Sequence, residues 1–152
     1  MEKIVVGYDH SPAAQGALAW GIDYSCRSGA ELIIVYGVSS AWEWELAAIQ
    51  VNPDPIRHKI GQLLRQDWTA PVRAAGIHHQ TEVLVGRPAD VLLASARRHE
   101  AALIVLGMTG RGTLGELVTG STGRQIAHHA VRPIVTVPAG WTPRVPEIGQ
   151  ER

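Results

Sequence analysis

Short runs of apolar residues alternate with longer segments of mixed polarity along this chain. The runs are rich in Val, Ile and Leu, and short apolar runs of this kind are typical of strands buried in a parallel sheet. The five predicted strands cover residues 4–8, 32–36, 81–85, 102–106 and 134–137. The segments between them are long enough to hold helices, so the chain predicts alternating strands and helices.

Capping residues mark where these helices begin and end. Ser11 followed by Pro12 predicts a helix start, because serine is a favoured cap and proline a favoured first helical residue. Gly29 predicts the end of the same helix. The predicted helices cover residues 12–28, 54–76, a segment beginning at 88, and 121–130, whereas residues 37–53 are expected to be irregular.

This order of elements predicts an α/β fold with a doubly wound, five-stranded parallel sheet, Rossmann-like and built as a single domain. Sheets of this kind bind ligands at the carboxyl ends of their strands, where the strand order reverses. Residues 139–152 are rich in Pro and Gly, and we expect this C-terminal tail to be flexible. The domain itself is expected to cover residues 1–138.

Composition and charge narrow the classes of function. The 152 residues carry 14 basic and 14 acidic side chains, and this balance argues against nucleic acid or a membrane surface as a partner. Cys26 is the only cysteine, so no disulfide can form within the chain. The sequence shows neither a signal peptide nor an apolar stretch of about 18 residues. We therefore expect a cytoplasmic protein.

The strongest candidate for chemistry is a glycine-rich loop, residues 107–122, between a predicted strand and a predicted helix. Glycines let successive backbone N–H groups turn into one concavity that holds an anion. Ser121 and Thr122 stand where the next helix should begin, and free N–H groups there favour phosphate. The sequence thus predicts a polyphosphate site, against the alternative that the loop is only a flexible turn.

Two common phosphate motifs do not fit. The stretch from Gly115 to Thr122 resembles a P-loop, but Ser121 occupies the position of the lysine that contacts the terminal phosphates. The dinucleotide fingerprint expects its glycines after the first strand, where this chain has Gly7 and then Tyr8 to Ser11. Arg111 and Arg124 remain candidates to pair with phosphate.

A family resemblance rests on the spacing of three glycines. Gly107, two residues, Gly110, nine residues, and then Gly120-Ser121 resembles the G-2x-G-9x-G-(S/T) signature of ATP-binding universal stress proteins. The opening strand with its acidic turn, Val85 to Pro88, and residues 129–137 are also similar to this family. The resemblance implies the adenine nucleotide α-hydrolase-like form of the Rossmann-like fold.

The resemblance also implies roles for residues. Asp9 would contact the ribose or a Mg²⁺ ion carried by ATP, Gly37 or Val38 would meet the adenine through the backbone, and Arg111 to Thr113 would cover the triphosphate. The implied nucleotide-binding residues are Gly7, Asp9, Gly37, Val38, Leu106, Gly107, Met108, Thr109, Gly110, Arg111, Gly112, Thr113, Gly120, Ser121 and Thr122. No catalytic residue is implied.

Two details around Asp9 complete the candidate site. From the residues alone, Asp9 fits two roles equally: a ligand of ribose or Mg²⁺, or a cap of the following turn. His10 stands where members of the family commonly have glycine, and Tyr36-Gly37 stands where His-Val is frequent.

The predicted function is therefore that of a nucleotide-dependent sensor or regulator in the stress response, with ATP and Mg²⁺ as its ligands. Two alternatives remain: a slow ATP-hydrolysing enzyme of the α-hydrolase group, and an assembly module that does not use nucleotide. Because the P-loop lysine and a catalytic base are missing, any hydrolysis should be slow. We also expect a homodimer through the last strand, residues 134–137, whose apolar edge lacks protecting lysines.

Overall fold

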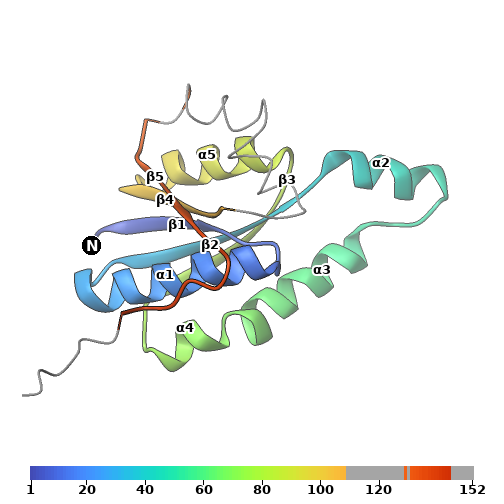
Figure 1. Ribbon diagram of the computed structural model, residues 1–152. Helices are drawn as coiled ribbons and strands as arrows, with labels where there is room; N and C mark the ends of the chain where they lie inside the picture. Colours follow the sequence, from blue (N-terminus) through green and yellow to red (C-terminus); the bar gives the residue numbers. More distant parts are fainter. Residues whose placement is uncertain (109–128, 130, 145–152) are drawn as a thin grey trace, which may run out of the picture.

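The computed structural model describes residues 1–108, 129 and 131–144. Its centre is a parallel sheet of five strands in the order β3-β2-β1-β4-β5, which confirms the predicted fold class (Figure 1). The strand order reverses between β1 and β4, because the chain first builds outward through β2 and β3 and then returns to the other side of β1. The strands are β1 (Lys3–Gly7), β2 (Glu31–Val38), β3 (His79–Val85), β4 (Leu103–Gly107) and β5 (Ile134–Val137).

Helices cover both faces of this sheet (Figure 1). One face packs against α5 and the other against α1 and the chain from α3 to α4, and each face has its own buried apolar cluster. Side chains of β1 alternate between the two clusters: Val5 points to the α5 face, and Ile4 and Val6 point to the α1 face. The helices are α1 (Pro12–Ser28), α2 (Ser40–Ala48), α3 (Asp54–Leu63), α4 (Ala70–Ala74) and α5 (Pro88–Arg98), and η1 (Leu64–Trp68) is a π-helical turn.

The predicted boundaries of the first helix are confirmed. The Ser11 hydroxyl accepts a hydrogen bond from the Ala14 amide at 3.1 Å, as a cap should, and Pro12 is the first helical residue. Gly29 ends the helix in the left-handed region with φ of 77°. Cys26, near that end, is exposed.

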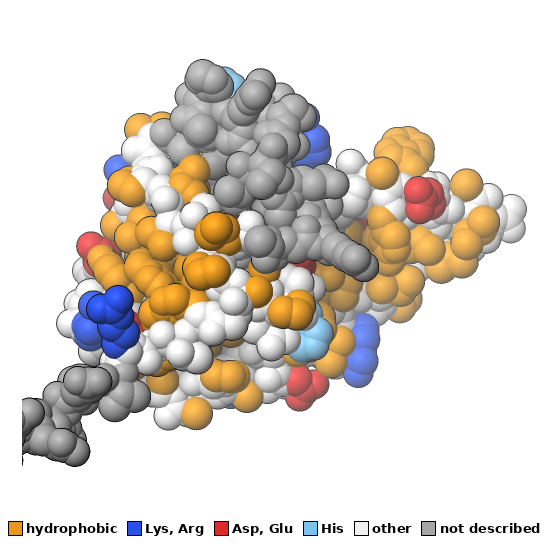
Figure 2. All heavy atoms as spheres, in the orientation of Figure 1, with side chains coloured by type: hydrophobic (Ala, Val, Ile, Leu, Met, Phe, Trp, Pro, Cys, Tyr) orange, Lys and Arg blue, Asp and Glu red, His pale blue; other side chains and the backbone are white. Residues whose placement is uncertain are grey.

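The prediction that residues 37–53 are irregular is wrong. Gly37 and Val38 extend β2, because β3 lies alongside and pairs with both. The following residues form α2, which holds no buried residue and therefore lacks the apolar period by which a helix is recognised. Figure 2 shows hydrophobic side chains along the arm formed by α2 and α3, where Trp44 is exposed.

The single helix predicted over residues 54–76 is divided into α3, the π-helical turn η1, and α4. Pro71 explains the break, because proline has no N–H for the carbonyl four residues earlier and its ring crowds that carbonyl. The Thr69 hydroxyl donates to the Leu64 carbonyl oxygen at 2.7 Å, and the Arg73 guanidinium donates to the Arg65 and Gln66 carbonyls. Three carbonyls in the turn before the break, those of Leu64, Arg65 and Gln66, are thus hydrogen-bonded to side chains.

The last strand has the predicted bounds and lies at one edge of the sheet. After it, Trp141 packs against the α1-face cluster, so the first part of residues 139–152 contacts the domain. The helix predicted over residues 121–130 falls almost wholly outside the described residues.

Candidate functional site

The carboxyl ends of β1 and β2 form a small cleft beside the point where the strand order reverses. Asp9 follows β1, and Gly37 lies near the end of β2; both line the cleft. Pro88, Val91 and Leu92 of α5 form the opposite wall. This is the position at which sheets of this type bind their ligands.

The backbone N–H and C=O of Gly37 face this cleft. In a parallel strand, the N–H and C=O of one residue point to the same neighbouring strand, and successive residues alternate. The Val35 carbonyl accepts from the Tyr8 amide at 2.9 Å on the β1 side, and the Val38 carbonyl accepts from the Gly86 amide at 2.9 Å on the β3 side. Gly37 therefore turns toward β1 but lies beyond the last residue of that strand, so among the described residues its backbone N–H and C=O have no partner on this side.

The missing side chain of Gly37 keeps the cleft open. A Cβ atom at this position would lie 3.2 Å from the Val91 Cγ2 atom and 3.5 Å from the Pro88 Cα atom, both in the opposite wall. Of the two candidates for a backbone contact to adenine, Gly37 thus has the suitable geometry. Val38 is buried, and its carbonyl is already hydrogen-bonded.

Asp9 occupies a tight turn between β1 and α1. Its Oδ1 atom accepts a hydrogen bond from the Ser11 amide at 3.0 Å, which is the capping role considered above. Its other oxygen, Oδ2, accepts no hydrogen bond from the described part of the chain, so the same carboxylate can bind a ligand. His10, in the middle of this turn, has φ of 63°.

Four rings gather behind this turn: Tyr8, His10, Tyr36 and Trp68. The Tyr8 hydroxyl lies 3.0 Å from the His10 Nδ1 atom, and the His10 and Trp68 rings stack with centroids 4.5 Å apart. Burial, followed by the nearby charge of Asp9, raises the pKa of Tyr8 to about 12 and raises that of Tyr36. Both tyrosines therefore stay neutral at physiological pH. No local pattern in the sequence indicates this aromatic cluster, because its members come from three separate segments of the chain.

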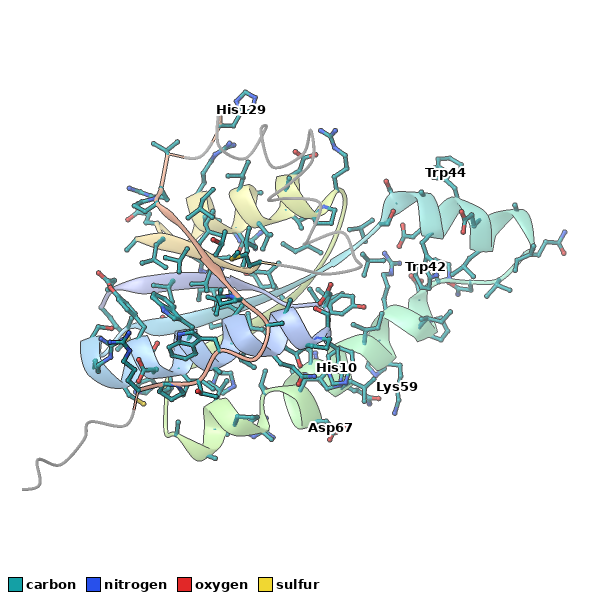
Figure 3. All side chains as sticks on the ribbon, viewed as in Figure 1. His10, Trp42, Trp44, Lys59, Asp67 and His129 are labelled. Atoms are coloured by element: carbon teal, nitrogen blue, oxygen red, sulfur yellow. The ribbon has the colours of Figure 1, made fainter. Side chains whose placement is uncertain are left out.

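A cavity of about 310 Å³ lies beside the aromatic cluster, between α1 and η1. Tyr8, His10 and Trp68 line it together with Leu18, Ile22 and the carboxylate-bearing Asp67. Figure 3 shows His10 at the start of α1 and Asp67 below it. The cavity is on the α1 face of the sheet, on the other side from the α5 wall of the cleft.

Gly107 ends β4 and has a structural reason to be glycine. A Cβ atom there would lie 2.6 Å from the Ala13 carbonyl carbon and 2.7 Å from the Ala13 Cβ atom, closer than real contacts allow. The end of β4 thus passes directly against the first turn of α1. The first glycine of the signature serves this close packing whether or not a ligand is bound.

The other predicted site residues divide into two groups. Gly7 and Leu106 are buried at the ends of β1 and β4, and Leu106 packs in the α5-face cluster. Met108 is exposed after β4, and its amide donates to the Val137 carbonyl at 2.7 Å. The remaining predicted residues lie outside the described residues: Thr109, Gly110, Arg111, Gly112, Thr113, Gly120, Ser121 and Thr122.

Among the described residues, no three His, Cys, Asp or Glu side chains come together to hold a metal ion. Asp9 alone still suits Mg²⁺, because this ion is commonly held by one or two carboxylates together with the phosphates of a nucleotide. Its Oδ2 atom, which accepts no hydrogen bond from the described residues, is of the right chemistry for that contact.

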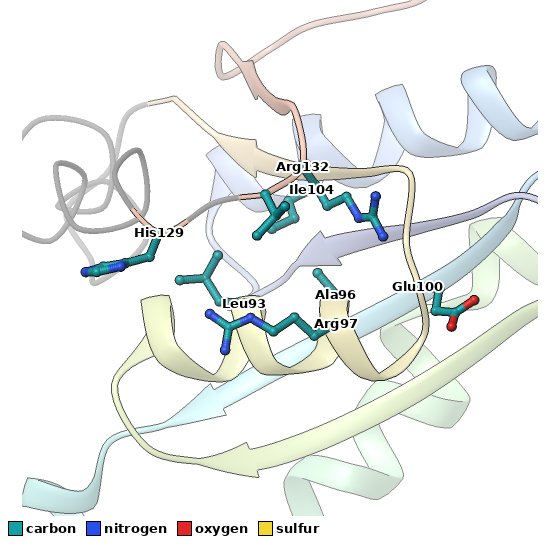
Figure 4. A pocket seen from close by; sticks show the side chains of 8 residues that line it. Leu93, Ala96, Arg97, Glu100, Ile104, His129 and Arg132 are labelled. Atoms are coloured by element: carbon teal, nitrogen blue, oxygen red, sulfur yellow. The ribbon is translucent and has the colours of Figure 1, made fainter.

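A second hollow, of about 340 Å³, lies near the edge of the sheet that β5 forms (Figure 4). It is lined by the second half of α5 with Arg97, by Glu100 after that helix, and by residues just before β5 with Arg132. None of the predicted nucleotide-binding residues that the structure describes lines it, and it adjoins the end of α5 and not the carboxyl ends of the strands.

Comparison with known proteins places this architecture in a family. The model of the universal stress protein family matches residues 1–138. The chain belongs to the universal stress protein family. A universal stress protein of Thermus aquaticus is 27% identical over 137 residues, which is 90% of this chain and 98% of that protein. One from Methanocaldococcus jannaschii is 25% identical over 146 residues, which is 90% of this chain and 81% of that protein.

Several other universal stress proteins are longer than this chain. A relative from Mycolicibacterium smegmatis is 24% identical over 140 residues, which is 88% of this chain but 47% of that protein. One from Mycobacterium bovis is 29% identical over 133 residues, which is 87% of this chain and 44% of that protein. The chain thus spans about half the length of the mycobacterial relatives it matches.

Solved structures of universal stress proteins share the fold. The protein UspA from Lactobacillus plantarum superimposes with a TM-score of 0.63 at 27% identity, covering 90% of this chain and 97% of UspA. A universal stress protein in complex with cAMP has a TM-score of 0.67 at 24% identity, covering 91% of this chain and 97% of that chain.

In the described part of this chain, no helix combines the length and apolar character needed to cross a bilayer.

Proposed function

We propose that this universal stress protein binds an adenine nucleotide, with ATP and Mg²⁺ as its ligands, and acts as a nucleotide-dependent sensor or regulator. The observation that carries the proposal is the cleft at the ends of β1 and β2. It brings the Asp9 carboxylate next to backbone groups of Gly37 beside the reversal of strand order, and within the described residues one Asp9 oxygen and these Gly37 groups have no hydrogen-bond partner.

Each part of the cleft suits one part of the nucleotide. The N–H and C=O of Gly37 can hydrogen-bond the edge of an adenine ring, and Val91 and Leu92 supply an apolar wall for its face. The Asp9 carboxylate can accept from ribose hydroxyls or bind a phosphate-bound Mg²⁺. Gly107 leads from β4 into the glycine signature, whose backbone N–H groups we assign to the phosphates.

Ligands of related structures support an adenine nucleotide. Universal stress protein structures similar in fold to this chain contain cAMP, dAMP in a protein from Archaeoglobus fulgidus, and AMP in one from Arabidopsis thaliana. These ligands share adenine and a sugar, the two groups that the Gly37 and Asp9 side of the cleft would bind. The choice of ATP among adenine nucleotides rests on the glycine signature of residues 107–121.

We further propose that two chains pair through β5. This strand is the edge of the sheet, and its Val135 and Ile134 are only partly buried. An apolar edge of this kind pairs readily with another strand. Two copies around a twofold axis would each cover the β5 edge of the other.

Titration calorimetry with ATP and Mg²⁺ tests the nucleotide site. Asp9→Asn and Gly37→Ala should each weaken binding about tenfold or more, which corresponds to about 1.4 kcal/mol. Gly61→Ala is the matched control: its new Cβ would meet only the flexible end of Arg65, in α3 away from the cleft. If wild-type protein freed of nucleotide shows no binding at millimolar ATP, the proposal is wrong. If all three variants bind equally well, the nucleotide binds elsewhere.

A further inference from the structure

We propose that Trp68 is a positioning residue for the nucleotide site: by stacking on His10 it holds the turn that orients Asp9. This inference rests on the proposed role of Asp9 in nucleotide binding. Trp68 does not line the cleft of Asp9 and Gly37 and acts from the α1 face of the sheet.

The turn around His10 needs support from outside. With φ of 63°, His10 lies in the left-handed region, which side chains with a Cβ disfavour and glycine adopts freely. This conformation lets the Asp9 Oδ1 atom reach the Ser11 amide, two residues on, at 3.0 Å. If His10 relaxed to a negative φ, that hydrogen bond would break and the Asp9 carboxylate would lose its fixed direction.

Among the described residues, two side-chain contacts hold the His10 ring in this conformation. The Trp68 ring stacks on the His10 ring with centroids 4.5 Å apart and planes 13° from parallel. The Tyr8 hydroxyl lies 3.0 Å from the His10 Nδ1 atom. Tyr36 packs against Trp68 as well, with centroids 5.8 Å apart and planes 25° from parallel. Trp68 is thus the ring that His10 and Tyr36 share.

The π-helical turn accounts for the position of Trp68. Trp68 is the last residue of η1, and such turns inside α-helices change the direction of the side chains that follow and recur at functional sites. Thr69 is fully buried. Its hydroxyl lies 2.7 Å from the Leu64 carbonyl oxygen and 3.1 Å from the Arg65 carbonyl oxygen, and these contacts stabilise the turn. Hydrogen bonds that do not depend on any ligand therefore fix Trp68 where it meets His10.

The expected effect on binding follows from the fraction of molecules in which the turn around His10 has the conformation that binds ATP. When only part of the molecules have the competent turn, the apparent dissociation constant rises by the inverse of that fraction. Removing the Trp68 ring should reduce this fraction and weaken ATP binding about fivefold to tenfold. Glycine at position 10 adopts this conformation without a stacked ring, so removing the Trp68 ring from a His10→Gly variant should have little effect on ATP binding.

A double-mutant cycle between positions 68 and 10 tests the inference with two readouts. The variants are Trp68→Met, which fills much of the space without a ring, Trp68→Phe, which keeps a ring, His10→Gly, and the double variant Trp68→Met/His10→Gly. Hydrogen exchange of the Ser11 amide reports on the turn itself, and calorimetry reports on ATP affinity. Thermal melting of each variant verifies that it is folded.

The inference predicts that Trp68→Met speeds exchange of the Ser11 amide and weakens ATP binding by about fivefold to tenfold each. Trp68→Phe should keep most of the slow exchange of the Ser11 amide and most of the ATP affinity. In the His10→Gly background, Trp68→Met should change the exchange rate and the ATP affinity by less than about twofold each. Equal effects of Trp68→Met in both backgrounds would mean a general loss of packing and would overturn the inference. If the wild-type protein binds no nucleotide, the proposed function fails, and Ser11 exchange alone still decides whether Trp68 holds the turn.

Discussion

Glu82 links the edge strand β3 to α5, and its replacement gives a quantitative test of how this side of the cleft is held. Its Oε2 atom accepts from the Ser95 hydroxyl at 2.8 Å and from Arg98, and its Oε1 atom lies 2.6 Å from the His99 Nε2 atom. Ser95 is fully buried, and the Glu82 side chain is only 15% exposed. The carboxylate is therefore the partner of a hydroxyl that has no access to water.

The magnitude follows from these contacts. Glu82→Ala leaves the buried Ser95 hydroxyl without its acceptor, which costs about 1–3 kcal/mol, and removes hydrogen bonds to a charged group. The contribution of Arg98 is small because that side chain is 52% exposed. We expect a loss of about 3 kcal/mol in the free energy of unfolding at pH 7. For a chain of this size, that lowers the melting temperature by about 6–12 °C.

The same contacts predict how stability depends on pH. Burial alone would raise the pKa of Glu82, but the hydrogen bonds from His99, Ser95 and Arg98 outweigh it and hold the pKa below the ordinary value of 4.5. A carboxylate with a lowered folded-state pKa stabilises the protein above pH 4.5, and this stabilisation is lost as the pH falls through the folded-state value. The difference in stability between wild type and Glu82→Ala should therefore shrink on acidification.

Urea denaturation of wild type, Glu82→Ala and Ser95→Ala at pH 7 and near pH 4 measures these effects. Ser95→Ala is the matched control because it removes the buried donor along with its need for a partner, and it should cost less than Glu82→Ala. An equal midpoint for wild type and Glu82→Ala at pH 7 would refute the reasoning. A stability difference that grows as the pH falls would refute the sign of the pKa shift.

Three further predictions concern packing, phosphate binding and assembly. Gly107→Ala should destabilise the fold by about 1–3 kcal/mol in urea denaturation, because its Cβ overlaps Ala13, and a wild-type midpoint would contradict that packing. Gly120→Ala should weaken ATP binding more than about tenfold in calorimetry while the melting temperature stays near wild type; unchanged affinity would remove Gly120 from the phosphate site. Val135→Lys should shift the protein from dimer toward monomer in light scattering, whereas a wild type that is already monomeric at micromolar concentration would disprove pairing through β5.

The sequence was sufficient to predict the sheet because its strands carry their own signal. Buried parallel strands are apolar on both faces, so each appears as a short continuous run, and capping residues such as Ser11 and Gly29 mark helix ends locally. Where the structure depends on a distant neighbour, prediction failed. The end of β2 is a strand because β3 pairs with it. The helix α2 was not predicted because it has no buried face and therefore no apolar period in its sequence.

The candidate site shows the same division. Asp9 and the glycine signature could be proposed from the sequence because their residue types and spacing carry chemistry within a short stretch. The preference for Gly37 over Val38 depends on which neighbouring strand each residue faces, which spacing alone does not reveal. The contact of Trp68 with His10 joins the end of η1 to the turn before α1, and it depends on a π-helical turn that no local pattern predicted.

The most direct test of the central claim is a crystal structure of this protein with ATP and Mg²⁺. The account predicts adenine hydrogen-bonded to the backbone N–H or C=O of Gly37, with the Asp9 carboxylate on the ribose or on Mg²⁺ and the phosphates against residues 107–122. Adenine bound in the cavity between α1 and η1, or in the hollow beside Arg97 and Arg132, with the cleft at Asp9 empty, would contradict it.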